Sequence, residues 1–464
     1  MTRLLHHGGS VAIGRIALSA LRMAAALIVA RLAGVQDFGA YALMLTLIGI
    51  AEWLVDFGQT DMAVRDMARR PRRRTIMIAA LVRIKMVQGP VVALALPLML
   101  MATGQAPDMI WAGCTAGIAI IATAWMQPAR AALRLALRMN RDVGAELAGV
   151  MLMLPLLALA CLLSAPLWVM IGTFAIGRMA QAMLMACWVG PVGKRSRRPH
   201  APLYLARQAV PLGCAGLMVL LYDALAPVLL ASLMDMHAVA LYAAAARFTV
   251  PVLIAVQAMA SAAFPMMARD WRHDPDAFAR TQQGIVNLSA AWAATAFAGL
   301  HGGAEFVMGL MGPDFVTGAP LLQLMAWTML ARAITMAMAP LIMIAGWQGR
   351  AMMLTLTSLA VQCAALILLV PGMGVMGAAW ACLLVELLLG TVAVSHVAQR
   401  STDLMLDWRP VILMVGGAIA SIVLIAQSPV AGSFAGGAIA ASIILAAILL
   451  FHGKRPWLTK AGIA

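Results

Sequence analysis

Four arginines could do chemistry because each lies near the middle of a long apolar stretch: Arg22, Arg178, Arg247 and Arg332. A charged side chain in such a place costs about 2.5–3.5 kcal/mol on membrane-insertion scales, so each is expected to face a partner or a wet cavity. Guanidinium groups bind phosphate oxygens through paired hydrogen bonds. We therefore predict that these arginines contact an anionic ligand. Arg178 and Arg332 have no acidic neighbour in their own stretches, which favours that role.

Arg15 extends this candidate site, because it precedes Arg22 by two helical turns and shares its helix face. The alternative is structural: Arg15 or Arg22 pairs with Glu52 or Asp56 of the next apolar stretch. Those two carboxylates are one turn apart near the end of their helix. They are candidates for proton relay, although helix-end carboxylates more often pair with arginine.

Two further acidic residues lie inside apolar stretches. Asp223 follows Tyr222 at the middle of its stretch, and Glu386 is a weaker case of the same kind. An ionisable residue within a membrane is a functional candidate by default, so both are predicted to take part in gating or ion coupling. The alternative for Asp223 is a buried pair with Arg247 that fixes packing.

The elements that position these residues must be membrane helices. Apolar residues make up 63% of the 464-residue chain and charged residues 11%, against about 45–50% and 25% in soluble domains. The mean hydropathy is +0.93. Continuous apolar runs without alternation predict an all-α polytopic fold with about fourteen spans and exclude an outer-membrane barrel. The predicted spans are 10–33, 38–57, 76–103, 108–127, 144–164, 166–190, 206–232, 238–265, 282–302, 317–345, 351–370, 374–398, 410–427 and 432–452.

The net charge of +15 would suit nucleic acid, but the positions of the basic residues exclude that partner. Most Lys and Arg fall in the segments between spans that lie on one side of the membrane, taken here as the inner side. The predicted outer segments hold only Arg31. The positive-inside rule then predicts cytoplasmic termini. Arg83, Lys85 and Arg207, near inner span ends, are expected to extend to the surface. The run at Pro71–Arg74 is expected to contact anionic membrane lipids.

An internal repeat supports two lobes. Ala30, Leu32, Tyr41 and Ala42 match Ala231, Leu233, Tyr242 and Ala243 at one constant offset, although an alanine-rich chain also produces chance matches. A true repeat predicts lobes at 1–200 and 201–400, a helix pair at 401–464, and the alternating access of paired-lobe transporters. At the same offset Arg22 and Asp223 are equivalent positions of the two repeats. We therefore predict that these two residues face each other across the lobes in at least one state.

Enzyme and metal signatures are absent from the sequence. It contains no GxxxxGK[ST], HExxH, GxSxG or CxxC motif, and its six cysteines all lie in apolar spans. The 37 methionines are spread through nearly every span without His or Cys at ligand spacing, which favours packing over copper binding. We expect no catalytic activity, no cofactor and no metal.

Several motifs together resemble bacterial polysaccharide and O-antigen flippases of the multidrug/oligosaccharidyl-lipid/polysaccharide exporter superfamily. The resemblance covers roughly residues 10–400. The residues that carry it are Ala30–Tyr41, Asp56–Gly58 with Arg65, Leu241–Arg247, Met311–Phe315 with Pro320–Leu324, and Gly374–Ala381.

The resemblance implies transport of a polyprenyl-diphosphate-linked oligosaccharide from the inner to the outer leaflet of the bacterial inner membrane, without ATP hydrolysis. It implies a role in lipopolysaccharide or exopolysaccharide export, with a polysaccharide polymerase and glycosyltransferases as candidate partners. Three alternatives stay open: a drug/cation antiporter, a flippase for lipid-linked peptidoglycan precursors, and a non-transporting scaffold of a polysaccharide assembly complex. An antiporter should keep acidic residues in its cavity, whereas these spans lean basic.

Overall fold

The computed structural model describes residues 2–189, 201–271, 273–400 and 407–426, with a few more between 435 and 442. Within these ranges every regular element is a helix, and ten helices are long and apolar enough to cross a membrane. The prediction of an all-α polytopic membrane protein is confirmed. The count of fourteen spans stays a prediction, and most of the last span lies outside the described residues.

The chain divides into two compact units, Met1–Ala240 and Leu241–Ala464. The division falls inside the helix Met236–Asp270. The last long helix before it, Ala201–Leu233, packs with the first unit. The lobes at 1–200 and 201–400 and the helix pair at 401–464 stay predictions.

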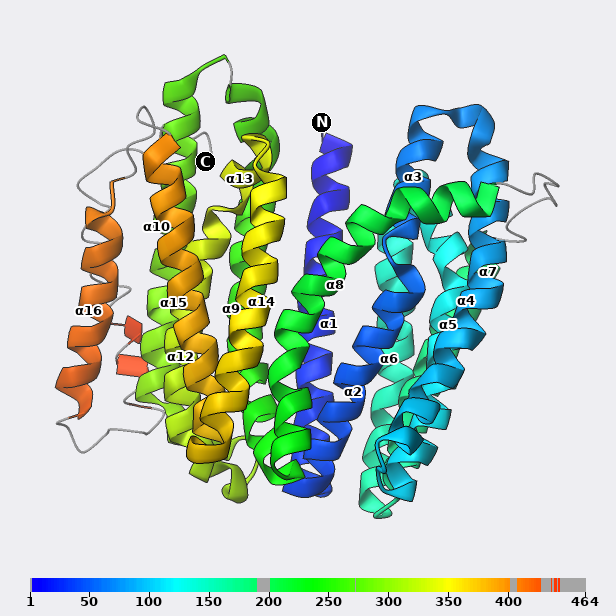
Figure 1. Ribbon diagram of the computed structural model, residues 1–464, viewed down its shortest axis with the longest axis horizontal. Helices are drawn as coiled ribbons and strands as arrows, with labels where there is room; N and C mark the ends of the chain where they lie inside the picture. Colours follow the sequence, from blue (N-terminus) through cyan, green and yellow to red (C-terminus); the bar gives the residue numbers. More distant parts are fainter. Residues whose placement is uncertain are drawn as a thin grey trace. The chain divides into compact units, whose positions relative to one another are not determined.

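The first unit is built around one central helix, α5, which packs against α2, α3, α4 and α7 (Figure 1). Small residues on α5, among them Gly113, Ala116 and Gly117, let neighbouring backbones approach closely, which is how membrane helices gain contact area. The elements of this unit are α1 (Thr2–Leu32), α2 (Val35–Asp56), α3 (Gln59–Arg69), η1 (Pro71–Arg73), α4 (Arg74–Ala102), α5 (Pro107–Leu135), α6 (Met139–Leu162), α7 (Leu167–Val189) and α8 (Ala201–Leu233).

The second predicted span, 38–57, ends at a break in the helix. α2 ends at Asp56, Phe57 and Gly58 adopt left-handed φ angles of 43° and 71°, and α3 then begins. Glycine takes this conformation without strain, whereas Phe57 is held there by its neighbours. The Phe57 ring packs where Gly213 of α8 has no side chain, and Trp53 Nε1 donates to the Gly213 carbonyl at 3.2 Å. The break is therefore a packed feature of the fold.

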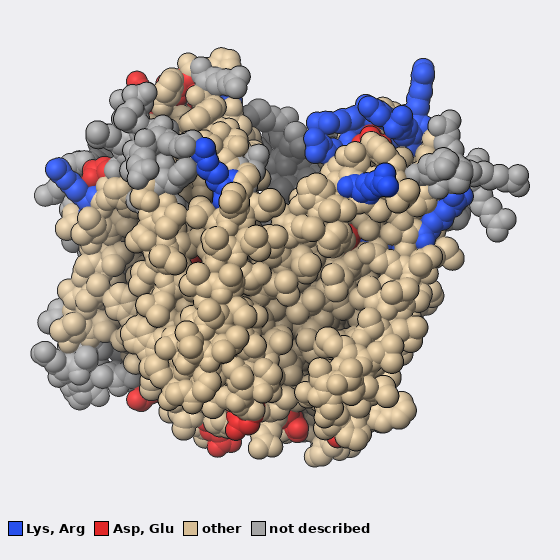
Figure 2. Space-filling view, in the orientation of Figure 1, with Lys and Arg blue, Asp and Glu red and all other residues tan. Residues whose placement is uncertain are grey.

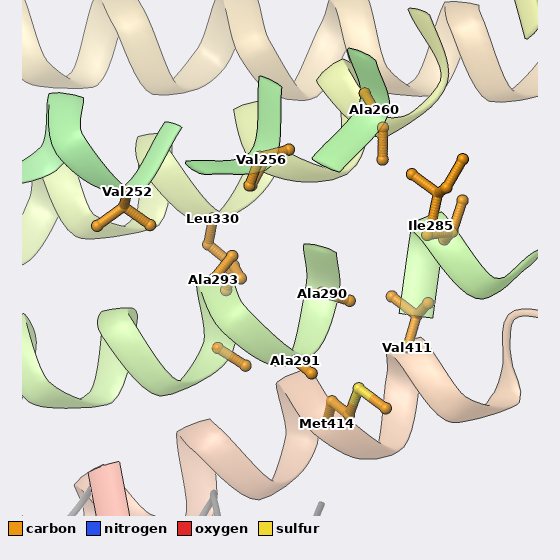
Figure 3. Packing of buried hydrophobic residues seen from close by; sticks show 14 of the residues in the cluster. Val252, Val256, Ala260, Ile285, Ala290, Ala291, Ala293, Leu330, Val411 and Met414 are labelled. Atoms are coloured by element: carbon orange, nitrogen blue, oxygen red, sulfur yellow. The ribbon is translucent and has the colours of Figure 1, made fainter. Parts of the chain in front are cut away.

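The second unit contains a continuous apolar core formed by α9, α10, α12 and α16. Figure 3 shows Val252 and Val256 of α9 facing alanines of α10, with Val411 and Met414 of α16 closing the other side. Its elements are α9 (Met236–Asp270, beginning in the first unit), α10 (Pro275–Gly302), α11 (Ala304–Gly309), η2 (Pro313–Gly318), α12 (Ala319–Ala337), α13 (Ala339–Ile344), α14 (Gln348–Met373), α15 (Val375–Arg400) and α16 (Arg409–Ala426).

Charge is distributed along the helices as the sequence predicts for a membrane protein. In the first unit Figure 2 shows Lys and Arg gathered over the end that holds α3 and η1, beside a wide surface without charge. Turns at the other helix ends instead hold acidic residues, Asp37 and Asp108. The basic loop with Lys194, Arg195, Arg197 and Arg198 lies outside the described residues.

This charge pattern leads to a prediction of topology. Reporter fusions placed in the segment Arg65–Arg74 and after Ala464 are both expected to report the cytoplasm, because basic segments are retained on that side. A periplasmic signal from the C-terminal fusion would contradict the even number of spans.

Candidate functional site

A chain of ion pairs inside the first unit connects four helices. Arg22 of α1 contacts the carboxylate of Glu146 on α6. Arg178 of α7 contacts Glu52 of α2, with 2.9 Å between Nη2 and Oε2, and its Nη1 is 3.9 Å from Glu146 Oε1. The ion pairs therefore run from Arg22 to Glu146, then to Arg178, and then to Glu52. Two positive and two negative side chains alternate, so the cluster is neutral as a whole.

Close packing of α6 against α7 brings the middle of this chain together. A Cβ added at Gly149 would lie 2.5 Å from the Gly177 carbonyl oxygen, and one at Gly177 would lie 2.7 Å from the Gly149 carbonyl oxygen. Two glycines facing each other allow the backbones to touch. Glu146 is one turn before Gly149 and Arg178 directly follows Gly177, so this crossing places the carboxylate beside the guanidinium.

This crossing leads to a prediction for Gly149→Ala. The new methyl group meets backbone that cannot move aside, so we expect the free energy of unfolding to fall by about 1–3 kcal/mol. Thermal unfolding of the purified protein measures this. Gly144→Ala is the matched control on α6, because its Cβ would meet only the Trp188 ring at 3.8 Å. That variant should gain stability, since alanine is the better helix former. Equal effects of both substitutions would contradict the close crossing.

Arg178 is the most heavily contacted member of the cluster. Besides its two carboxylates, Nη1 donates to Gln181 Oε1 at 3.0 Å, and the guanidinium carbon lies 5.1 Å from the centre of the Phe174 ring. The Thr123 hydroxyl donates to Glu52 at 2.8 Å from α5. The Arg178 side chain is 16% exposed and that of Arg22 is 53% exposed. Arg22 is thus the more accessible of the two arginines.

Two buried donors in this cluster have no hydrogen-bond acceptor within the described part of the chain. They are Nε of Arg178 and Nε2 of Gln181. A buried donor without an acceptor costs about 1–3 kcal/mol, so such groups are usually satisfied by a ligand or a water molecule. The cluster therefore still has capacity for oxygen atoms, which phosphates, sugars and water all provide.

A second set of ion pairs joins α5 to α6 and to α3. Arg130 of α5 donates from Nε to Asp142 of α6 at 3.0 Å, and Arg134 contacts Asp61 of α3. The helix α5 continues beyond the predicted span end at residue 127 to Leu135, and the Arg130 side chain is largely buried between helices.

The structural alternative for Arg22 named the wrong partner. Arg22 contacts Glu146, and neither Glu52 nor Asp56 forms an ion pair with it in the described residues. Asp56 instead lies near Lys85, with 3.9 Å between Oδ1 and Nζ. The expectation that Lys85 extends to the surface was also wrong, because its side chain is 1% exposed. The α2 break provides a polar site within reach of α4.

In the second unit, Arg332 of α12 lies 3.5 Å from Glu386 of α15, measured from Nε to Oε1. Glu386 is 2% exposed. One turn before it, Cys382 lies 3.4 Å from the Tyr242 hydroxyl and 3.5 Å from Gln362 Nε2. Arg332 therefore has an acidic partner on another helix. The pair gives the buried Glu386 carboxylate a cationic partner.

The remaining candidates lie in different surroundings. Arg15 and Asp223 are exposed in the first unit, and Arg247 is half-buried in the second. Because Asp223 and Arg247 belong to different units, a pair between them stays a prediction. In this structure Arg22 contacts Glu146, so its pairing with Asp223 in another state also stays a prediction. The ligand-binding and gating roles predicted for all nine residues are proposals.

Sequence reasoning missed Glu146 and Gln181, although both belong to the cluster. Glu146 lies at the start of the predicted span 144–164. A signal did exist: Asp142 and Glu146 are one turn apart, which repeats the spacing of Glu52 and Asp56. Gln181 gave no signal, since single glutamines in spans are common. In the described part of the chain, no group of three or more His, Cys, Asp or Glu is arranged to hold a metal ion.

Comparison with known proteins gives a family match and a fold. A family model described as polysaccharide biosynthesis protein matches residues 8–271. No curated protein sequence matches the chain. The fold is similar to that of the lipid II flippase MurJ in an inward closed conformation, with a TM-score of 0.81, 10% identity, and 96% of this chain and 98% of that chain covered.

Two other solved structures are similar in fold. An inward-facing multidrug resistance MATE family transporter of the MOP superfamily has a TM-score of 0.66 and 13% identity, with 89% of this chain and 96% of that chain covered. A MOP superfamily transporter from Pyrococcus furiosus, described as having a binding pocket of reverse polarity, has a TM-score of 0.59 and 15% identity, with 84% and 94% covered. At these identities the likeness shows the fold alone.

Proposed function

We propose, since this chain belongs to the family of polysaccharide biosynthesis proteins, that it is a transporter for a lipid-linked oligosaccharide. In this proposal the oligosaccharide is covalently linked to a polyprenyl diphosphate. The carrier lipid and its oligosaccharide move from the inner to the outer leaflet of the bacterial inner membrane by alternating access between two lobes. The protein is then not an enzyme and uses neither ATP nor a cofactor. Its product feeds polysaccharide assembly outside the membrane.

The observation that carries this proposal is the cluster of Arg22, Glu146, Arg178 and Glu52. The half-exposed guanidinium of Arg22 pairs with one carboxylate among the described residues, whereas Arg178 is held on several sides. The unsatisfied Nε of Arg178 and Nε2 of Gln181 add two donors. A diphosphate provides many acceptor oxygens and about two negative charges, and it forms charge-assisted hydrogen bonds with guanidinium groups.

The mechanism that follows is competitive. An incoming diphosphate takes Arg22 from Glu146, and Glu146 keeps Arg178 as its counter-ion, because Arg178 Nη1 lies 3.9 Å away. No carboxylate is left unpaired, so the exchange avoids the cost of an isolated charge in low dielectric. The membrane potential, negative inside, favours outward movement of anionic cargo by about 2.3 kcal/mol per charge per 100 mV. Such a carrier needs no ATPase.

The antiporter alternative is less well supported. A drug or cation antiporter needs carboxylates that are available to positive cargo, whereas Glu52 and Glu146 both contact Arg178. A flippase for lipid-linked peptidoglycan precursors uses a chemically similar diphosphate, and the likeness to the lipid II flippase concerns the fold alone. A non-transporting scaffold would not need donors without acceptors inside a helix bundle.

Reconstitution tests these functions directly. Purified full-length protein in liposomes would be given a fluorescent polyprenyl-diphosphate oligosaccharide, lipid II, or a cationic dye, and transfer between leaflets or uptake would be measured. The proposal expects transfer of the oligosaccharide carrier above protein-free liposomes. Transfer of lipid II alone would favour the precursor flippase, and proton-driven dye movement alone the antiporter. Movement of none, with a correctly folded protein, would favour the scaffold.

A further inference from the structure

The break between α2 and α3 encloses the most deeply buried cation among the described residues, Lys85 of α4. Its Nζ donates to the Val55 carbonyl oxygen, to Gln59 Oε1 at 2.9 Å and to the Asp56 carbonyl oxygen at 3.3 Å. The carboxylate of Asp56 lies 3.9 Å away. The side chain is 1% exposed, so these protein oxygens replace nearly all of the water around the ammonium.

The oxygen atoms around Lys85 Nζ would also suit a free cation as ligands. Two main-chain carbonyls, one amide oxygen and one carboxylate are the oxygen ligands that hard cations take in proteins. Both carbonyls are at the C-terminal end of α2, where the helix dipole is negative and carbonyls lack partners within the helix. The left-handed turn at Phe57 and Gly58 allows the chain to fold back so that Gln59 contributes as well.

Neighbouring side chains fix this shell from several helices. The Thr60 hydroxyl contacts the Asp56 carboxylate and lies 3.1 Å from Gln127 Oε1 of α5. Gln88, one turn after Lys85 on α4, donates from Nε2 to the Leu54 carbonyl at 2.7 Å. α4 and α5 pack closely here, because a Cβ at Gly89 would lie 2.7 Å from Ala124 Cβ. The Asp56 carboxylate and the end of α2 are therefore held by contacts that do not involve the Lys85 ammonium.

We propose that the α2 break is a monovalent cation site whose occupant is the tethered ammonium of Lys85. The side chain acts as a tethered counter-ion for the end of α2 and for Asp56. When the side chain is removed, the same oxygens accept a free ammonium ion or K⁺, which are close in size to the lysine headgroup. The wild-type protein is then independent of dissolved monovalent cations at this position.

The experiment is chemical rescue of Lys85→Ala. The purified full-length variant is unfolded thermally in choline chloride, ammonium chloride, KCl and NaCl at one ionic strength. In choline chloride its unfolding temperature is expected to fall by about 5 °C or more, since a group of oxygens loses its cation. Ammonium chloride should restore at least half of that loss, with K⁺ next and Na⁺ weaker. Wild-type protein should show no such selectivity.

Three control variants make the result specific. Lys85→Met removes the charge but fills the space, so it should be destabilised and not rescued. Arg83→Ala removes an exposed cation from the same helix and should show no difference in stability among the four salts. Gln59→Leu keeps the lysine and removes one ligand, so it should lose stability equally in all four salts. If Lys85→Ala does not accumulate, Gln59→Leu replaces it as the test. A Gln59→Leu variant as stable as wild type would then overturn the proposal.

The proposal is overturned if Lys85→Ala is as stable as wild type in choline chloride. It is also overturned if all four salts give Lys85→Ala the same stability, or if the salts restore the stability of Lys85→Met as well. Its consequence for transport rests on the proposed function: Lys85→Ala should transfer lipid-linked oligosaccharide only when ammonium or K⁺ is present. The stability measurement needs no cargo. Cation-selective rescue of stability without any transfer, in wild type as well, would therefore contradict the proposed function and leave the cation site intact.

Discussion

Arg178→Ala is expected to abolish transfer of lipid-linked oligosaccharide, with a loss of at least about tenfold, and also to lower stability. Among the described residues its guanidinium is the one cationic partner of Glu52 and the second of Glu146. Removing one member of a largely buried pair leaves an uncompensated charge, which costs about 3 kcal/mol. Reconstituted transfer and thermal unfolding of the same preparation measure the two effects separately.

The double variant Arg178→Ala with Glu52→Gln provides the control for this result. Neutralising the orphaned carboxylate should recover most of the lost stability, because the new side-chain amide keeps an acceptor for the Thr123 hydroxyl. Transfer should remain absent, since the donors contributed by Arg178 are still missing. If transfer returns together with stability, Arg178 has a structural role only. A single variant with normal transfer would remove the cluster from the mechanism.

Much of the fold could be predicted because a bilayer imposes simple constraints. About twenty apolar residues make a span, and basic segments mark one side, so the all-α polytopic class follows from hydropathy and charge alone. The end of the second span at residue 57 also follows from hydropathy, but the left-handed turn at Phe57 and Gly58 does not. Phe57 has no intrinsic preference for the left-handed conformation, and the turn depends on packing of Phe57 and Trp53 against Gly213, far along the chain.

The site could be predicted only in part, for the same reason. Costly mid-span charges identified Arg22 and Arg178 as residues that need partners, and spacing identified Glu52. Which partner each one contacts depends on which helices are neighbours. Glu146 reaches Arg178 because glycines on α6 and α7 let those two helices touch, and a single sequence does not reveal that pairing. Lys85 was misjudged because its depth was read from the helix end alone, without the oxygens of the α2 break.

Arg22→Ala is expected to reduce transfer as strongly as Arg178→Ala, by at least about tenfold, but with near-normal stability and abundance. Its side chain is half exposed, so little packing is lost, and Glu146 retains Arg178 as a counter-ion. Arg22→Lys should recover transfer only partly, because lysine keeps the charge but loses the two-pronged hydrogen bonding of guanidinium to phosphate. Arg247→Ala is predicted to have the same effect from the second unit. Reconstituted transfer of the oligosaccharide carrier, normalised to protein, gives the comparison.

Arg31→Ala is the matched control, since this arginine lies on the same helix but in its last turn, in the predicted outer segment. It should leave transfer close to wild type, which separates the position of the charge from its mere presence on α1. Stability and transfer falling together in Arg22→Ala would show that the ion pair with Glu146 is structural. Normal transfer in both Arg22→Ala and Arg247→Ala would contradict the proposed role of these two arginines in binding the diphosphate.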